Sequence, residues 1–241
     1  KGRADVAGKL IGSAVALPYG AFAWVCMVLV SPDWRRRGIA TDLMARALEV
    51  LESAGTIAGL DATPDGRKVY RHLDFRDVYG IARMWAETVT AHAAPSIPAR
   101  IAPLADAEIE EIAAYDMSRF GGDRAALLAH LRRRVPGRAY VARIGDCPAG
   151  YVLARDGRKA MQIGPLIAES PDIALNLVRH ALDGLSGPAV IDCPDRHTPL
   201  IGWLERCGFV FQRPYVRMLR GREEPLDEPD FIFALAGPEL G

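Results

Sequence analysis

The chain has 241 residues, 50% hydrophobic and 25% charged, which is enough for two ordinary domains with buried cores. Its thirty basic and thirty acidic residues cancel, and this balance argues against a nucleic-acid or membrane-surface partner and favours small molecules. The sequence contains no apolar run of 18 residues or more, and we expect no signal peptide within it. The sequence begins at Lys1 rather than Met, so we allow for a segment upstream of it.

The four cysteines indicate a reduced, cytoplasmic protein. Cys26, Cys147, Cys193 and Cys207 form no CxxC pair and no disulfide framework. Cys193, His197 and Cys207 come nearest to a metal site, but their spacing matches no standard zinc motif and a fourth ligand is not apparent. We therefore predict no metal.

A β-hairpin is predicted near the start of the chain. Residues 1–8 are polar and typical of a loop, and the loose alternation of Lys9–Leu17 then predicts a strand. Residues 18–20, Pro-Tyr-Gly, are a turn signal. Phe22–Val30 follows as a second strand, rich in apolar and β-branched residues and antiparallel to the first.

The stretch from Trp24 to Ser53 carries the strongest functional signal. Its strand is stopped by Ser31-Pro32, passes through three arginines and Gly38, and enters a helical pattern that Gly55 ends. Apolar residues recur at helical spacing along one side of this pattern: Leu43, Met44, Ala47, Leu48, Val50 and Leu51. A strand, a basic glycine loop and a helix in this order are typical of an anion site.

The entrance of this helix has the chemistry to bind a phosphate. The first backbone N–H groups of a helix lack intrahelical partners, and the helix dipole adds a partial positive charge of about half a unit. Gly38 lets the backbone approach a ligand, Ala40 keeps the next turn thin, and Arg35, Arg36 and Arg37 add charge. The pattern R-x-x-G-x-A is weak by itself, and the alternative is that the arginines form a solvated turn.

Three further elements are predicted in the first half. Thr56–Ala62 reads as a short buried strand. Thr63-Pro64 predicts a helix that starts with an N-cap threonine and a proline in its first turn. The next strand begins at Phe75.

With the strand before it and the helix after it, the loop resembles the acyl-CoA pyrophosphate loop of the GNAT superfamily of N-acetyltransferases. The segment LDATPDGRKVYRHLDF resembles the family's stretch that usually reads Y…GF, except that Asp74 replaces the glycine, where the backbone is usually left-handed. The resemblance implies that acetyl-CoA lies in a V-shaped gap between Phe22–Val30 and Thr56–Ala62, with a backbone N–H near Val28 facing the thioester oxygen. The residues it implies at the CoA are Val28, Val30, Arg35, Arg36, Arg37, Gly38, Ile39, Ala40 and Thr41.

The resemblance also implies catalytic residues. Tyr70 stands where the family places a tyrosine that protonates the departing CoA thiolate, although an aromatic residue on the apolar face of a helix is more often part of the core. Asp61, at a strand end, is a candidate base for the attacking amine, and the alternative is an ordinary turn or cap residue. A complete domain of the family has a strand, two helices and another strand before the hairpin. We therefore expect the first domain to lack its opening elements, and with them part of its acceptor site.

The second half repeats this order of elements. Residues 91–99 are small, polar and proline-containing and predict a linker between a first domain, 1–90, and a second domain, 100–241. After the linker we predict a strand, one or two helices within Ala105–Arg134, a hairpin, a strand, a helix, a strand, a helix and a closing strand. WLERCGFVF parallels VYRHLDFRD of the first half. The fold class is therefore α+β, an α/β mixed sheet in two tandem GNAT-like domains.

The second domain is predicted to be degenerate. GPLIAESPDIA has no glycine in the turn before its helix, and Glu169 and Asp172 there would repel a pyrophosphate. Leu204 stands where the repeat aligns it with Tyr70, and leucine cannot transfer a proton. This organisation, with the closing DFIFALAGPELG, resembles a bacterial GNAT subgroup with a catalytic first domain and a degenerate second one.

These features predict an enzyme that moves an acetyl group from acetyl-CoA to an amine of a small molecule or peptide by direct attack, without a covalent enzyme intermediate. The runner-up is a non-catalytic acyl-CoA-binding sensor or assembly module. A nucleic-acid contact through Arg35–Arg37 is disfavoured by the zero net charge and by the lack of aromatic residues among the basic ones. No residue pattern indicates the acceptor or the acyl chain length, and a homodimer is allowed but not indicated.

Overall fold

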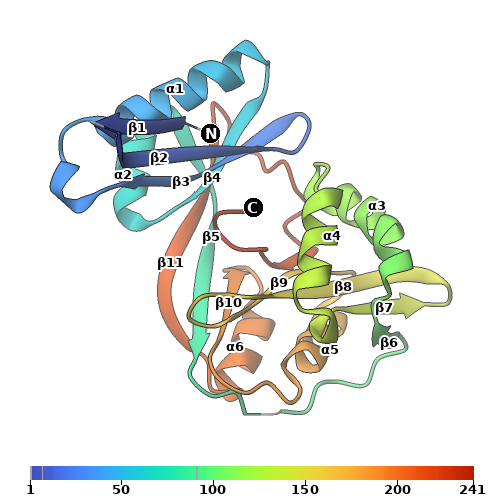
Figure 1. The fold of residues 1–241 in the computed structure, drawn as a ribbon. Coiled ribbons are helices and arrows are strands. Elements are labelled where there is room, and N and C mark those ends of the chain that lie inside the picture. The colour runs from blue at the N-terminus through green and yellow to red at the C-terminus, as the bar shows by residue number, and fades with distance from the viewer. Residues whose placement is uncertain (1, 7, 91) are drawn as a thin grey trace. The chain divides into compact units, whose positions relative to one another are not determined.

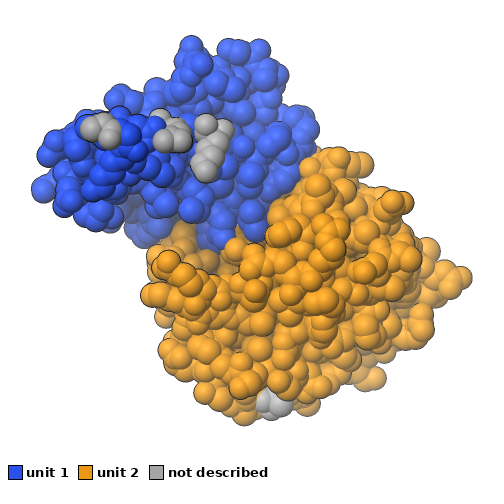
Figure 2. Space-filling model, in the orientation of Figure 1, with its two compact units in different colours: residues 1–78, 216–223, 238–241 blue, residues 79–215, 224–237 orange. Residues whose placement is uncertain are grey.

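The computed structural model describes residues 2–6, 8–90 and 92–241. The chain folds as two compact units, coloured separately in Figure 2. Unit 1 consists of residues 1–78, 216–223 and 238–241, and unit 2 of residues 79–215 and 224–237.

Unit 1 is a mixed sheet with two helices (Figure 1). Its strand order is β1-β2-β3-β4-β11, antiparallel except for the parallel pair β3–β4. The strands are β1 (Gly2–Val6), β2 (Lys9–Pro18), β3 (Phe22–Val30), β4 (Ile57–Ala62) and the end of β11 (Val210–Arg220). The helices are α1 (Ile39–Ser53) and α2 (Pro64–Arg71). The predicted hairpin, the helix after the glycine loop and the N-cap role of Thr63 are confirmed, since the Thr63 hydroxyl accepts a hydrogen bond from the Gly66 N–H.

Strand alternation gives the sheet of unit 1 two different faces. Ala23 and Val25 of β3 lie in one apolar core with Met44 of α1. Trp24 and Cys26 point to the opposite side and are also buried, 2% and 8% exposed. We call the side covered by α1 the helix face and the side of Trp24 the tryptophan face.

One segment that was predicted to be a loop forms a strand in the structure. Within the expected loop 1–8, Gly2–Val6 forms β1, which pairs antiparallel with β2. The prediction was wrong because GRADV lacks the apolar alternation that indicates a strand, and its backbone is fixed by the neighbouring edge of β2 instead. Residues 1 and 7 lie outside the described part of the chain.

Unit 2 is a second mixed sheet, with four helices longer than one turn. Its strand order is β5-β10-β9-β8-β7-β6, and β12 pairs with β9. Only the pair β9–β10 is parallel among the pairs described. The strands are β5 (Phe75–Ala86), β6 (Arg100–Pro103), β7 (Tyr140–Ile144), β8 (Cys147–Asp156), β9 (Met161–Ala168), β10 (Ala189–Pro194) and β12 (Ile232–Ala234). The helices are α3 (Ile109–Phe120), α4 (Ala125–Arg134), α5 (Pro171–Leu182) and α6 (Thr198–Arg206).

The elements predicted for the second half are confirmed in their order, and Ala105–Arg134 contains two helices, α3 and α4. Their core is apolar and extensive, and it includes Leu177 of α5 and Trp203 of α6. The short strand β12 was not predicted, because three residues are too few for a periodic pattern. None of the described helices combines the length and the apolar content needed to cross a membrane.

The division into domains at residues 91–99 stays a prediction about the repeat. The compact units are divided elsewhere, because β5 and β11 each have residues in both units. Residue 91, at the start of the expected linker, lies outside the described residues, and residues 92–97 are irregular.

Candidate functional site

The expected gap lies beside β3. The parallel pairing of β3 with β4 runs from Phe22–Ile57 to Trp24–Gly59. Beyond Trp24, β3 continues to Val30 and is paired with β2 on its other edge. From Val25 onward, β3 is not paired with β4 in the described part of the chain. We call this unpaired side the open edge of β3, and an extended ligand could pair with its backbone.

A β-bulge interrupts β3 within this stretch. On β2, Ala14 lies opposite two residues of β3, Met27 and Val28. Met27 has a φ of 51°, in the left-handed region that non-glycine residues rarely adopt, and the Ser13 hydroxyl donates a hydrogen bond of 3.1 Å to its carbonyl oxygen. Strained backbone held by its neighbours is often found at functional sites. The bulge re-aims the backbone next to Val28, whose N–H group was expected to face the thioester.

The N-terminus of α1 is uncapped. Its N-cap is Gly38, with a φ of 80° that glycine adopts without strain, and no side chain of the described residues caps the helix. The N–H of Asp42 donates to the Gly38 carbonyl oxygen at 3.0 Å, which is the first bond of the helical ladder. The N–H groups of Ile39, Ala40 and Thr41 therefore have no partner within the helix and are available to a ligand.

Three exposed arginines lie directly before this helix. Arg35 donates from Nε to the Val30 carbonyl oxygen at 3.3 Å, and Arg37 lies over the ring of Trp34 at 4.8 Å. Arg36 adopts a φ of 59°. Within residues 2–6, 8–90 and 92–241, none of the three forms an ion pair with a carboxylate. Their charge is therefore available to an anion bound at the helix N-terminus.

Tyr70 lies on α2 with its ring half-buried. The ring is 5.9 Å from that of Phe75, and Tyr70 and Val28 pack against the same core cluster of unit 1. Gly66 leaves room for the ring, because a Cβ there would come within 3.0 Å of it. Burial raises the pKa of Tyr70 above its ordinary value of 10.0. The hydroxyl thus stays protonated at neutral pH and can donate a proton.

The side chain of Asp61 is fully buried on the tryptophan face. Arg217 of β11 donates from Nε and Nη2 to its two oxygens at 3.0 and 3.1 Å, and the guanidinium lies 4.4 Å from the centre of the Trp24 ring. Protonating this carboxylate would break a buried, bidentate pair, so it is a poor proton acceptor. A general-base role for Asp61 stays a prediction, and the pairing favours a positioning role.

Residues 238–241 also pack on the tryptophan face, which the sequence analysis missed. Trp24 donates from Nε1 to the Pro238 carbonyl oxygen at 3.1 Å, and the Tyr19 hydroxyl donates to the Leu240 carbonyl oxygen at 2.7 Å. These partners are 214 and 221 residues apart in sequence, so no local pattern could have indicated the contact.

Glu239 lies between these two anchored residues, close to Cys26. Burial, followed by the negative charge of Glu239, raises the pKa of the Cys26 thiol to about 11. Cys26 is the residue immediately before the bulge at Met27. A carboxylate is therefore near the residue that precedes the bulge, on the tryptophan face.

Unit 2 contains the same strand arrangement, but its gap is filled. Strands β9 and β10 pair in parallel over three residue pairs, as β3 and β4 do. Next to this pairing, β12 lies against β9, and the N–H of Leu235 donates to the Asp192 carbonyl oxygen of β10 at 3.0 Å. Every residue from Ile232 to Ala236 is at most 2% exposed. In unit 2, residues 232–236 thus lie along β9. The corresponding strand in unit 1 is β3, and its edge is open.

The helix entrance of unit 2 is closed as well. Ser170 caps α5 by accepting a hydrogen bond of 3.3 Å from the N–H of Ile173. Asp172 lies in the first turn, and Glu169, just before the cap, forms an ion pair of 2.9 Å with an arginine of α3. Leu204, the counterpart of Tyr70 in the repeat, is buried in the core.

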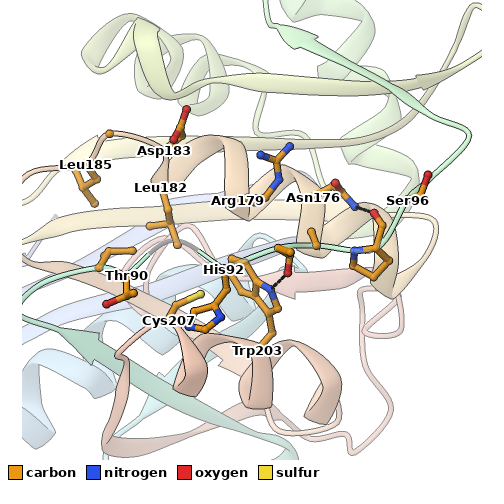
Figure 3. A pocket seen from close by; sticks show the side chains of 15 residues that line it. Thr90, His92, Ser96, Asn176, Arg179, Leu182, Asp183, Leu185, Trp203 and Cys207 are labelled. Carbon is orange, nitrogen blue, oxygen red and sulfur yellow. Dashed lines mark hydrogen bonds between the residues drawn. The ribbon is translucent and has the colours of Figure 1, made fainter.

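Two cavities lie apart from the residues expected at the acyl-CoA. The larger, about 560 Å³, is in unit 2 and is lined by Arg179 of α5 and by Trp203 of α6, which donates to the Ala93 carbonyl oxygen (Figure 3). The smaller, about 360 Å³, is beside the C-terminal end of α1. Neither is lined by a residue of the glycine loop. Among the described residues, no group of three or more His, Cys, Asp or Glu side chains could hold a metal ion.

Family comparisons agree with this duplicated arrangement. Residues 112–234 match the model of an acetyltransferase (GNAT) domain, and residues 3–75 match that of the acetyltransferase (GNAT) family. The chain belongs to the GNAT family. It is a tandem GNAT N-acetyltransferase, and both halves are built on the GNAT fold.

Individual relatives resemble the chain along most of its length. The uncharacterized N-acetyltransferase YitH of Bacillus subtilis is 26% identical over 241 residues, which cover all of this chain and 84% of that protein. A putative acetyltransferase of Pyrococcus horikoshii has a TM-score of 0.77 at 22% identity, over 98% of this chain and 78% of that one. A GCN5-related N-acetyltransferase of Sphaerobacter thermophilus has a TM-score of 0.61 at 18% identity, over 91% and 79%. At these identities the two structures establish the shared GNAT fold.

Proposed function

We propose that unit 1 binds acetyl-CoA with its pyrophosphate at the N-terminus of α1 and transfers the acetyl group to an amine of a small molecule or peptide. The observation that carries the proposal is the uncapped helix behind Gly38, with three arginines that no carboxylate of the described residues neutralises. Free backbone N–H groups, a helix dipole and nearby cations together suit a pyrophosphate. Ile39, Ala40 and Thr41 supply the N–H groups, and Arg35–Arg37 supply the charge.

The open edge of β3 positions the reacting carbonyl. In this proposal the pantetheine arm pairs with the backbone of Val28 and Val30, and the N–H beside the bulge faces the thioester oxygen. Such a donor stabilises the oxyanion that forms when the amine attacks, and its loss lowers the rate about 100- to 1000-fold in other acyl-transfer enzymes.

Tyr70 supplies the proton that the leaving group needs. As the C–S bond breaks, the CoA sulfur takes a proton from the Tyr70 hydroxyl, whose raised pKa keeps that proton available at neutral pH. Tyr70 and Val28 pack against the same core cluster, which fits a shared role at the thioester.

We assign no acyl transfer to unit 2. There β12 fills the gap between β9 and β10, and Ser170 caps the helix that would receive a pyrophosphate. One acyl-CoA site per chain follows from this difference between the units. The four cysteines are free, which fits the reducing cytoplasm in which we expect the enzyme to act.

Turnover with a defined amine panel tests the function. The purified chain, mixed with acetyl-CoA and with tyramine, spermidine, glucosamine or an amino acid, should release free CoA thiol faster than protein-free controls. Tyr70→Phe should lower kcat by about 100-fold while the Kd for acetyl-CoA stays within about twofold, because the hydroxyl acts on the leaving group rather than on binding. An unchanged kcat in Tyr70→Phe would remove Tyr70 from this role, and acetyl-CoA binding without turnover on any amine would contradict the proposed reaction.

A further inference from the structure

We propose that the second half of the chain, residues 100–241, donates a strand to unit 1, and that the first half, residues 1–90, donates the equivalent strand to unit 2. The donated strands are β11 and β5, each of which begins in one unit and ends in the other. The inference gives the second half a function although its own gap is filled and its helix is capped. It does not depend on the proposed acyl transfer.

The strands β5 and β11 occupy the same place in the repeat. The segment VYRHLDF leads into β5 and WLERCGF leads into β11, so Phe75 and Phe209 are equivalent. Eight residues after each phenylalanine there is an arginine, Arg83 in β5 and Arg217 in β11, and the next residue is a methionine in both strands. The two strands are therefore homologous, and their residues can be compared one by one.

The core packing of the two strands is exchanged. At their beginnings, Phe75 lies in the core cluster of unit 1 and Phe209 in that of unit 2. At their ends the order is reversed, because Met218 of β11 lies in the core of unit 1 and Met84 of β5 in the core of unit 2. Met84 and Met218 are 1% and 0% exposed. Each strand thus fills the core of the unit built by the other half.

The buried ion pairs are exchanged in the same way. Arg217 of β11 lies opposite Asp61 of β4 and donates to both of its oxygens, at 3.0 and 3.1 Å. Arg83 of β5 lies opposite Asp192 of β10 and donates to both of its oxygens, at 2.7 and 2.8 Å. β4 and β10 are equivalent, since each forms the parallel pair of its unit. Each aspartate is therefore neutralised by an arginine from the other half.

Unit 1 depends on the strand that it receives. β3 pairs with one side of β4, and β11 pairs with the other side, from Ala62–Val216 to Gly59–Leu219. Without β11, β4 would end the sheet with unpaired backbone groups, and the Asp61 carboxylate would be buried without its counter-charge. The second half thus has a function in unit 1 that needs no catalytic site of its own.

Disulfide trapping in the full chain distinguishes exchanged strands from unexchanged ones. Ala82 of β5 lies directly opposite Cys193 of β10, and Val216, the equivalent of Ala82 in β11, lies directly opposite Ala62 of β4. Directly opposite residues of antiparallel strands have Cα atoms about 4.5–5.5 Å apart, a separation that a disulfide spans. After refolding in a glutathione redox buffer, Ala82→Cys should form a disulfide with Cys193. Val216→Cys should form one only when Ala62→Cys is also present.

Peptide mass spectrometry identifies the linked residues, and non-reducing electrophoresis shows whether the link lies within one chain. A disulfide from Ala82→Cys to Cys193 within the monomer, with none from Val216→Cys to Cys193, supports the exchange. A disulfide between Val216→Cys and Cys193 would overturn it. So would a Cys193 that stays reduced in Ala82→Cys, or a link found only between two chains.

Hydrogen exchange in two matched arginine variants tests the donor role without any added cysteine. Arg217→Met leaves the Asp61 carboxylate unpaired, so the backbone amides of β4 should exchange at least about tenfold faster than in the wild type. Arg83→Met removes the equivalent arginine of β5 and should act mainly on β10, with a smaller effect on β4. Amides of β4 that exchange equally fast in the two variants, or faster in Arg83→Met, would contradict the donation of β11 to unit 1.

Discussion

At the scale of single residues, Asp61 and Arg217 form the buried centre of the tryptophan face. Their side chains are 0% and 3% exposed and meet through two hydrogen bonds. Desolvating two charges is unfavourable, and a buried pair seldom adds much net stability, yet removing one partner leaves the other uncompensated. The pair therefore fixes geometry, and here the geometry it fixes is that of Trp24 and the segment anchored on it.

Asp61→Ala should lower the free energy of unfolding by about 3–5 kcal/mol, because the Arg217 guanidinium would lose its buried counter-charge. Urea denaturation measures this directly. The double variant Asp61→Ala with Arg217→Met should recover part of the loss, since both charges of this pair are then removed. Glu49→Gln, in an exposed pair with Arg46, should change stability by less than about 1 kcal/mol. A loss in Asp61→Ala no larger than in Glu49→Gln would contradict the structural role of the pair.

At the scale of elements, the strand β12 is the main structural difference between unit 2 and unit 1. Two sets of contacts hold the segment: it pairs with β9, and the His197 Nε2 lies 2.8 Å from the Ile232 carbonyl oxygen and 3.0 Å from that of Pro229. The imidazole also stacks on Phe233, with ring centres 4.0 Å apart. His197 therefore fastens the segment that fills the gap.

The protonation of His197 should couple the stability of unit 2 to pH. Burial, opposed by the two backbone hydrogen bonds, lowers the pKa of His197 below its ordinary value of 6.5. The unfolded chain then binds a proton more readily than the folded chain, so this contribution to stability is present above about pH 6.5 and is lost as the pH falls through the folded-state pKa. The melting temperature of the wild type should fall between roughly pH 7 and pH 5, and that fall should be smaller in His197→Gln. Equal pH dependence in both proteins would show that His197 does not carry the effect.

The elements were predictable where local chemistry defines them. Pro32 and Gly38 mark the end of β3 and the start of α1, and Thr63 marks the start of α2, because a cap or a left-handed turn needs particular residues. Asp74, expected to be left-handed, has a φ of 63°. β1 and β12 were not predictable, since short strands owe their existence to a neighbouring edge rather than to their own pattern.

The candidate site was predictable only in part, for the same reason. The glycine loop is a contiguous segment, so its residues could be named from the sequence alone. The bulge at Met27 needs the register with β2, and Arg217 and Glu239 come to the site from positions more than 150 residues away. Contacts between residues so far apart depend on the tertiary fold, and no local pattern in the sequence indicates them.

At the scale of the whole molecule, the two GNAT units differ at the gap between their parallel strands. In unit 1 the edge of β3 from Val25 onward lies outside the parallel pairing, and α1 is uncapped. In unit 2 the corresponding edge is covered by β12 and the corresponding helix is capped by Ser170. The same C-terminal segment, residues 229–241, thus closes the gap in unit 2 and ends in residues 238–241, which belong to unit 1. This difference between the two homologous units predicts a single acyl-CoA site per chain.

The variants for testing this site act on the entrance of α1. Ala40→Glu places a carboxylate in the first turn, where it favours the helix but repels a pyrophosphate. Ala40→Gln has nearly the same size without the charge, and Val50→Glu adds the same charge at an exposed position farther along α1, where Val50 is 52% exposed. Comparing the three separates charge at the site from size and from net charge.

Calorimetric titration of acetyl-CoA into the wild type and these variants tests the central claim most directly. We expect one site per chain in the wild type, a Kd raised by at least about tenfold in Ala40→Glu, a smaller change in Ala40→Gln and no change in Val50→Glu. Two sites per chain, or an affinity in Ala40→Glu equal to that in Val50→Glu, would contradict the assignment of acyl-CoA binding to the α1 entrance of unit 1.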